Sequence, residues 1–141
     1  MTSMRLCSFA INARLAKDTI LIGDLALSRV LLMNDARFPW LVLVPRIDGA
    51  QEVFDLSTGD QQRLIMETAL CAQRLKMLTS AGKINIGALG NLVPQLHVHV
   101  VARGPGDDAW PGPVWGFGSP NPYPQAEADA LVARLRDVLD I

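Results

Sequence analysis

The chain has 141 residues, of which 50% are hydrophobic and only 19% are charged, so it can bury enough apolar surface to fold. Its 13 Lys and Arg residues against 14 Asp and Glu residues leave a net charge of −1. No basic run is present that could follow a nucleic-acid backbone. This composition excludes an intrinsically disordered chain and argues against general nucleic-acid binding.

The cysteines and the N-terminus indicate the compartment. Cys7 and Cys71 are far apart and form no C-x-x-C pair, which favours a reducing environment over a disulfide-stapled secreted domain. The first residues make a poor secretory signal, because Ser8, Asn12 and Arg14 interrupt the apolar run. No apolar stretch approaches the roughly 20 residues that cross a bilayer. We therefore expect a soluble cytoplasmic protein that does not bind membranes.

The segment from Thr19 to Arg46 alternates apolar runs with turn-forming residues at Gly23-Asp24 and between Asn34 and Pro39. This alternation predicts three strands in meander order. Two of the runs, RVLLMN and WLVLV, are almost entirely apolar. Such runs are typical of strands covered on both faces, by helices or by another subunit.

A long amphipathic helix is predicted between Asp55 and Gly82, because apolar residues recur there every three or four positions. Ser57 or Thr58 can cap its start, and Gly82 would supply the left-handed residue that commonly closes a helix. The helix would turn Cys71 toward the core, as an inert side chain.

The second half of the chain contains two more strand candidates, Lys83–Leu89 and Gln95–Arg103. Residues 104–124 contain six of the nine prolines and five of the eleven glycines, which predicts an irregular surface connection. An apolar stripe in residues 125–141 predicts a C-terminal helix. The element order favours an α+β fold, an antiparallel sheet with helices on one face.

We expect a single domain over residues 1–141, with its core at about 19–103, the Pro/Gly-rich connection at 104–124 and the C-terminal helix at 125–141. No internal repeat is visible in the sequence.

The only two histidines, His97 and His99, lie one residue apart in the second strand candidate. Because strand side chains alternate, Gln95, His97 and His99 would share one face, while the apolar residues between them face the core. With a rise of about 3.3 Å per residue, the two rings would lie roughly 6.6 Å apart along the strand.

Three interpretations fit this polar row. A half-exposed strand can carry Gln and His without any function. His-x-His can chelate a metal, but the sequence offers no third histidine and no recognisable partner motif, so we expect no metal. In the third interpretation one imidazole attacks phosphorus and the other stabilises the phosphoryl oxygens. The preceding NIGALGN segment would then approach a phosphate with backbone N–H groups, and Asn85 and Asn91 would add amide contacts.

The stretch NIGALGNLVPQLHVHVV, residues 85–101, resembles the signature of the histidine triad (HIT) superfamily, His-φ-His-φ-His-φ-φ with φ hydrophobic, after a Gly-rich strand and loop. The resemblance covers the element order from about Thr19 to Arg103, including WLVLVPR. Gln95 stands in place of the first motif histidine, so the chain resembles a divergent member. The resemblance implies a HIT-like fold, a five-stranded antiparallel sheet with a long central helix and a C-terminal helix.

The resemblance also implies a reaction. His97 would attack the α-phosphorus of a nucleoside phosphoramidate or dinucleoside polyphosphate, forming a covalent nucleotidyl-histidine that water or another acceptor resolves. His99 would bind and polarise the phosphate, with Gln95 in support. No metal or organic cofactor is needed for this step, and the nucleotide is the expected small-molecule partner.

Further roles follow from the same resemblance. Asn85 and Asn91 would lie near the phosphate and leaving group, and Asn34 near the ribose hydroxyls. The family homodimer continues the sheet from one subunit to the next, so we expect a homodimer.

Two departures from the family pattern favour an alternative, a nucleotide-binding module with weak or no catalysis. Gln95 cannot take or supply a proton near pH 7. Leu92 stands where many members have a small hydroxyl residue that assists the leaving group.

Two features of the C-terminal half have open roles. The connection carries four of the eight aromatic residues, and we expect Trp115 and its neighbours to cover the core or a dimer surface rather than the nucleotide. Arg103 would either help to hold phosphate or be a solvated surface charge.

Overall fold

The computed structural model describes residues 9–141, so the predictions for Cys7 and the start of the chain lie outside the described residues. Its helices are α1 (Ala13–Asp18), the 3-10 helix η1 (Val53–Asp55), α2 (Thr58–Thr79) and α3 (Gln125–Leu139). Its strands are β1 (Thr19–Asp24), β2 (Ser28–Met33), β3 (Trp40–Pro45), β4 (Lys83–Gly87) and β5 (Val98–Arg103).

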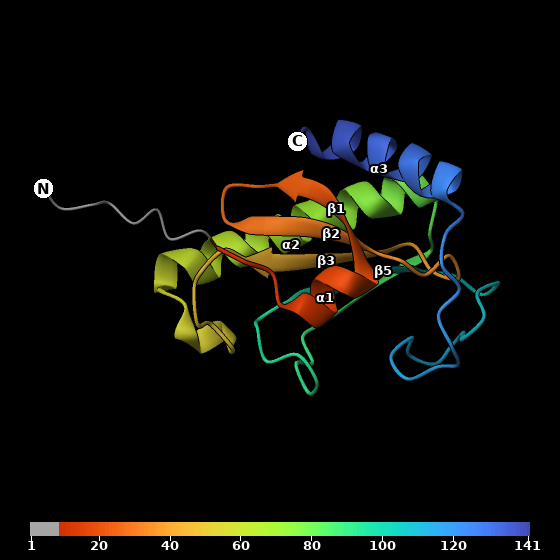
Figure 1. Cartoon of the computed structure of the whole chain (residues 1–141). Helices are drawn as coiled ribbons and strands as arrows, with labels where there is room; N and C mark the ends of the chain where they lie inside the picture. Colours follow the sequence, from red (N-terminus) through yellow and green to blue (C-terminus); the bar gives the residue numbers. More distant parts are fainter. Residues whose placement is uncertain (1–8) are drawn as a thin grey trace, which may run out of the picture.

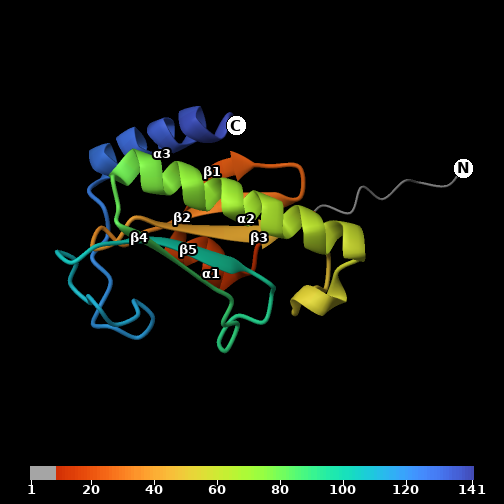
Figure 2. The same ribbon diagram turned by 180° about the vertical axis from the view of Figure 1, so that it is seen from behind.

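The five strands form one antiparallel sheet in the order β1-β2-β3-β5-β4, which confirms the predicted α+β class and the meander of the first three strands. Figures 1 and 2 show the sheet from opposite sides, with α2 and α3 packed on one face and α1 on the other. The sequence analysis placed helices on one face only, because the apolar pattern of the six-residue α1 is too short to recognise.

Both faces of the sheet are buried, as the apolar runs predict. All six residues of β3 are buried. Alternate side chains enter two separate clusters, because successive residues of a strand point to opposite faces. Leu41 and Leu43 join the cluster under α2 and α3, whereas Trp40 and Val42 join the one covered by α1 and by part of the 104–124 connection. The central strand is therefore covered on both sides within one chain.

The central helix begins where the sequence indicates and ends earlier. Ser57 caps α2, with its hydroxyl accepting from the Asp60 N–H at 3.2 Å. The left-handed residue that closes the helix is Ser80, with φ 53°, so the prediction of this role for Gly82 is wrong. Ser80 ends the helix by donating its N–H to the Lys76 carbonyl, which leaves Gly82 to lead into β4. Cys71 is fully buried, as predicted, and burial raises the pKa of its thiol to about 12.

The two C-terminal strands are shorter than predicted. β4 ends at Gly87 rather than Leu89, and β5 begins at Val98 rather than Gln95. The residues before Val98 bond outside the sheet, since the Leu96 N–H donates to the Ala50 carbonyl at 2.9 Å. The first histidine therefore lies in a loop just before the strand. Within residues 9–141, no helix combines the length and the apolar character that a membrane span requires.

A buried carboxylate connects α2 to the turn between β1 and β2. Glu67 is only 8% exposed, and its two oxygens accept from the backbone N–H groups of Leu27 and Ser28 at 2.9 and 2.8 Å. Charge-assisted bonds of this kind satisfy two donors that the tight turn would otherwise bury without partners. Glu67 thus fixes the helix against the edge of the sheet.

We expect Glu67→Ala to lower the free energy of unfolding by about 1.5–3 kcal/mol, because both backbone donors lose their partner. Glu67→Gln keeps one acceptor and should cost less. Urea unfolding at neutral pH measures both effects, with Gln73→Ala, an exposed position on the same helix, as the control. Equal stability of the Glu67→Ala and Gln73→Ala variants would contradict this role.

Candidate active site

His97 and His99 line one cavity of about 360 Å³. Their side chains are 7% and 6% exposed. The ring centroids are 4.9 Å apart with the planes inclined at 72°. This is closer than the expected separation of roughly 6.6 Å along a strand, and His97 lies just before β5 rather than in it. The structure thus brings the two predicted residues together beside a space that a ligand can enter.

A backbone carbonyl sets the tautomer of the neutral His97 ring. Its Nδ1 lies 2.7 Å from the Gln95 carbonyl oxygen, which can only accept a hydrogen bond. The hydrogen of the neutral ring must therefore be on Nδ1, which leaves Nε2 with a free lone pair. A histidine held in this form has the nitrogen that a nucleophile needs.

An indole sets the opposite tautomer of His99. The Trp40 Nε1–H donates to His99 Nδ1 at 3.0 Å, and an indole can only donate. The hydrogen of His99 must then be on Nε2, which makes this nitrogen a donor. The register of the sheet explains the contact, since Val42 pairs with His99 and Trp40 lies diagonally across from it on the same face.

The surroundings of His99 keep it neutral. Trp40, Trp115 and His97 surround its ring at centroid distances of 5.6, 5.5 and 4.9 Å. Burial, and secondarily the proximity of His97, lower the pKa of His99 to about 4. At neutral pH, His99 therefore offers a neutral N–H beside the lone pair of His97.

The side chain of Gln95, unlike its backbone carbonyl, makes its hydrogen bonds away from the histidines. Its Oε1 accepts from the Asn12 N–H at 2.8 Å, and its Nε2 donates to the Ala10 carbonyl at 2.9 Å. Both ends of the amide are thus used to hold the segment that leads into α1, whose Arg14, Leu15 and Asp18 line the cavity. The polar row expected on one strand face is therefore broken at Gln95, because β5 has not begun there.

Arg103 is buried, so the interpretation of it as a solvated surface charge is wrong, and it does not line the histidine cavity. It is 2% exposed, and its guanidinium donates to Asp107, to the Gly112 carbonyl and to Asn85 Oδ1. Asn85 does not line the histidine cavity. It lies two residues along β4 from Gly87, which pairs with His99.

Trp115 packs against Gly87 of β4 and beside His99. A Cβ added to Gly87 would lie 3.1 Å from Trp115 Cη2, so the indole packs directly on the glycine backbone. Its other neighbours are His99 and Trp40, and it lines the cavity. The connection therefore supplies a wall of the cavity in addition to packing Trp115 against the core, where the sequence analysis expected it to cover the core or a dimer surface.

The other two predicted asparagines line cavities. Asn91 lies on the wall of the histidine cavity. Asn34 lines a second cavity of about 330 Å³, and its Oδ1 accepts from the Tyr123 N–H at 2.9 Å. The two cavities adjoin, since four residues line both. These four are Asp18, Met33, Trp40 and Gly116.

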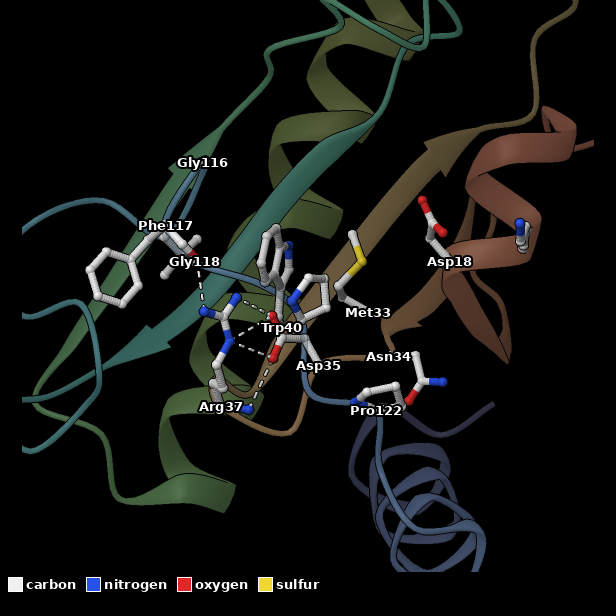
Figure 3. Close-up of a pocket in the computed structure, with 13 residues that line it drawn as sticks. Asp18, Met33, Asn34, Asp35, Arg37, Trp40, Gly116, Phe117, Gly118 and Pro122 are labelled. Carbon is white, nitrogen blue, oxygen red and sulfur yellow. Dashed lines mark hydrogen bonds and ion pairs between the residues drawn. The ribbon is translucent and has the colours of Figure 1, made fainter.

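Figure 3 shows this second cavity, with Asp18 on one side and the ion pair of Asp35 and Arg37 on the other. Asp35 is 2% exposed, and burial acts to raise its pKa, but hydrogen bonds from Arg37 and from the Asn121 N–H outweigh burial and lower it. Arg37 also donates to the Phe117 carbonyl at 2.7 Å. The ion pair thus attaches the 104–124 connection to the end of β2.

Within residues 9–141, no group of three His, Cys, Asp or Glu side chains is placed to hold a metal ion.

Comparison with protein-family models matches residues 14–106 to the HIT domain. The chain belongs to the HIT domain family. No match was found among curated proteins.

Solved HIT proteins share the whole architecture. A histidine triad protein from Sinorhizobium meliloti 1021 is 53% identical with a TM-score of 0.90, covering 92% of this chain and 96% of its own. One from Bradyrhizobium japonicum is 48% identical with a TM-score of 0.89 and the same coverage. One from Marinobacter aquaeolei VT8 is 44% identical with a TM-score of 0.91, covering 94% of this chain and 96% of its own. These similarities confirm the HIT fold predicted from the histidine motif.

The sequence analysis missed Trp40, Arg14 and Asp18 as residues of the HIT site. Trp40 could have been identified as a candidate, because its indole N–H is a hydrogen-bond donor at the start of an otherwise apolar strand. Its partner, His99, could not have been predicted, because the sequence does not reveal the register of β3 on β5. No sequence signal places Arg14 and Asp18, which reach the cavity because Gln95 holds the chain before them.

We expect Trp40→Phe to raise the pKa of His99 above its value of about 4. In the wild type the indole N–H faces Nδ1 and opposes the protonation of this nitrogen, and the variant lacks that donor. The neutral ring should also divide between its two tautomers. Nitrogen-15 NMR of the imidazoles measures both changes, with Trp110→Phe as the control. Protonation of His99 at Nδ1 in the neutral wild-type ring would contradict the assignment.

The stability of the HIT domain should fall as the pH drops from about 6.5 to about 4. Because the folded pKa of His99 lies below its ordinary 6.5, the unfolded chain binds the proton first. The slope should approach about 1.4 kcal/mol per pH unit within this window. Carboxylates with lowered pKa values, such as Asp35, affect the stability mainly at pH values below this window.

Urea unfolding at several pH values measures this slope, and His99→Gln should remove most of it. An unchanged slope in that variant would show that His99 is not held neutral.

Proposed function

We propose that this HIT protein is a nucleotide hydrolase or nucleotidyl transferase that acts at the α-phosphate of a nucleoside phosphoramidate or dinucleoside polyphosphate. HIT-family proteins generally bind nucleotides, and many are hydrolases. The observation that carries the finer proposal is the pair of opposite tautomers, with a lone pair on His97 and an N–H on His99 at the same cavity. A phosphoryl group between them would meet one nucleophile and one donor.

In the first step, the Nε2 lone pair of His97 forms a bond to the α-phosphorus. The bond from phosphorus to the leaving nitrogen or oxygen breaks, and its electron pair stays on the leaving atom. A leaving nitrogen takes a proton from solvent. The positive charge that develops on the imidazole is stabilised by the Gln95 carbonyl, which accepts from Nδ1–H at 2.7 Å.

In the second step, a water oxygen or another acceptor attacks the phosphorus. The bond to His97 Nε2 breaks, its electron pair returns to the ring, and the proton of the attacking group passes to solvent. His99 donates from Nε2 to a phosphoryl oxygen in both steps, and its low pKa keeps it in the neutral donor form.

The proposed roles of the three asparagines are supported to different degrees. Asn91 is on the wall beside the histidines, where it would contact the phosphate or leaving group. Asn34 lines the adjoining cavity, where its amide nitrogen would contact ribose hydroxyls. Asn85 has the weakest support, because it does not line the histidine cavity and its oxygen is already bonded to Arg103 at 2.8 Å.

A nucleotide-binding module with weak or no catalysis is the second candidate. The observation that favours it is the position of Gln95, whose amide is used by Ala10 and Asn12 rather than by the histidines. Besides the histidines, the ionisable residues lining the cavity are Arg14 and Asp18. Without a protein acid for the leaving group, the rate could be lower by on the order of 10²-fold.

We also propose a cytoplasmic homodimer organised as one domain. β4 is an edge strand, and Ile86 on it is 51% exposed, which supports pairing with a second copy through this edge. The net charge of −1 supports a small-molecule partner over nucleic acid.

Brief exposure to adenosine phosphoramidate, acid-free denaturation and intact-mass spectrometry test the covalent step. The wild type should gain one nucleotidyl group on His97, and His97→Ala should gain none. His99→Gln should still form the adduct, but slower by about 10²-fold, because it loses the fixed donor.

Calorimetric titration with AMP separates the two candidates. AMP binding by the wild type, with neither adduct nor AMP release from the amidate, would favour the binding module and contradict the enzyme.

A further inference from the structure

The loop between β4 and β5 forms an apolar wall of the histidine cavity. Leu89, Gly90, Asn91, Leu92 and Val93 all line it. Leu92 is 74% exposed and Leu89 44% exposed, so neither contributes much to the core. Single exposed leucines are common on proteins. These two differ from the usual case because they border the cavity that contains His97.

The position of this wall relates it to one part of the substrate. The histidine cavity adjoins the cavity that contains Asn34, where the proposed function places the nucleoside. The nucleoside and the leaving group are bonded to the same phosphorus and extend from it in different directions. Leu89 and Leu92 line the histidine cavity and not the Asn34 cavity, so a nucleoside beside Asn34 leaves the wall with the two leucines to the leaving group.

The charges of the cavity fit poorly with a phosphate chain. Its ionisable lining residues besides the histidines are one cation, Arg14, and one anion, Asp18, which cancel formally. His99 is neutral because burial lowers its pKa to about 4. A polyphosphate leaving group carries several negative charges, which proteins meet with several Arg or Lys side chains or a metal ion. The lining instead presents leucine, valine and tryptophan side chains.

We propose that the leaving group is an amine that carries a hydrocarbon substituent, and that Leu89 and Leu92 select it. This inference rests on the proposed function and chooses between its two substrate classes. When His97 attacks, the phosphorus–nitrogen bond breaks, its electron pair stays on nitrogen, and solvent supplies the proton that completes the amine. The hydrocarbon substituent stays against the two leucines, which water would otherwise cover.

A substrate series tests the selection. Release of AMP is measured for unsubstituted adenosine 5′-phosphoramidate, for its N-hexyl derivative, and for diadenosine tetraphosphate with Mg²⁺. We expect kcat/KM for the N-hexyl amidate to exceed that for the unsubstituted amidate by about tenfold or more, as for other apolar pockets. Diadenosine tetraphosphate should be the poorest of the three.

Substitutions in the loop between β4 and β5 test which residues select the hydrocarbon substituent. Leu92→Ala and Leu89→Ala should each lower the preference for the N-hexyl amidate, measured as the ratio of the two kcat/KM values, by about threefold to tenfold. Alanine adds no hydroxyl group that could assist the leaving group. A general loss of folding would lower both kcat/KM values and leave their ratio unchanged. Met77→Ala is the matched control, since Met77 is 65% exposed on α2 and lines neither cavity.

The outcomes distinguish this inference from the proposed function. Equal kcat/KM values for the two amidates, a preference unchanged by both leucine variants, or a faster reaction with diadenosine tetraphosphate would overturn the inference and leave the enzyme intact. AMP release from none of the three substrates, together with no adduct on His97, would overturn both.

Discussion

The pairing of β3 with β5 is the constraint on which the site depends. It sets Trp40 diagonally across from His99, and the indole donor then decides which nitrogen of His99 carries the hydrogen. A slip of one residue would move Trp40 to the other face, under α2, and leave His99 Nδ1 without this partner. The burial of both faces of β3 makes such a slip costly, so the apolar core also fixes the chemistry.

Periodicity and turn residues in the sequence were sufficient to predict the architecture. The apolar runs predicted the strands, and the three-to-four spacing predicted α2, because both follow from residues close together in the chain. The errors occurred where distant contacts decide. β5 starts late because Leu96 bonds to Ala50, and α2 ends early because Ser80 takes the left-handed conformation and its N–H bonds to the Lys76 carbonyl. Sequence periodicity does not identify such hydrogen-bond partners.

The predicted site is partly assembled and partly rearranged. His97, His99 and Asn91 meet at one cavity, and Asn34 lines the next. Asn85 does not line the histidine cavity and bonds to Arg103, and the Gln95 side chain bonds to residues more than 80 positions earlier. Adjacency in a motif predicted which side chains are near the histidines. It could not predict which of these side chains are hydrogen-bonded to another segment of the chain.

The cavity walls and the reacting groups come from different parts of the chain. The histidines are held by the sheet and by a backbone carbonyl, while the walls are contributed by α1, by the loop after β4 and by residues 114–118. The loop of residues 89–93 supplies no hydrogen-bond partner to either imidazole, so substitutions there change the cavity wall without removing a bond that orients the histidines. The shape of this part of the cavity and the orientation of the rings thus depend on different residues, and the same pair of histidines would face a different set of ligands after changes in one surface loop.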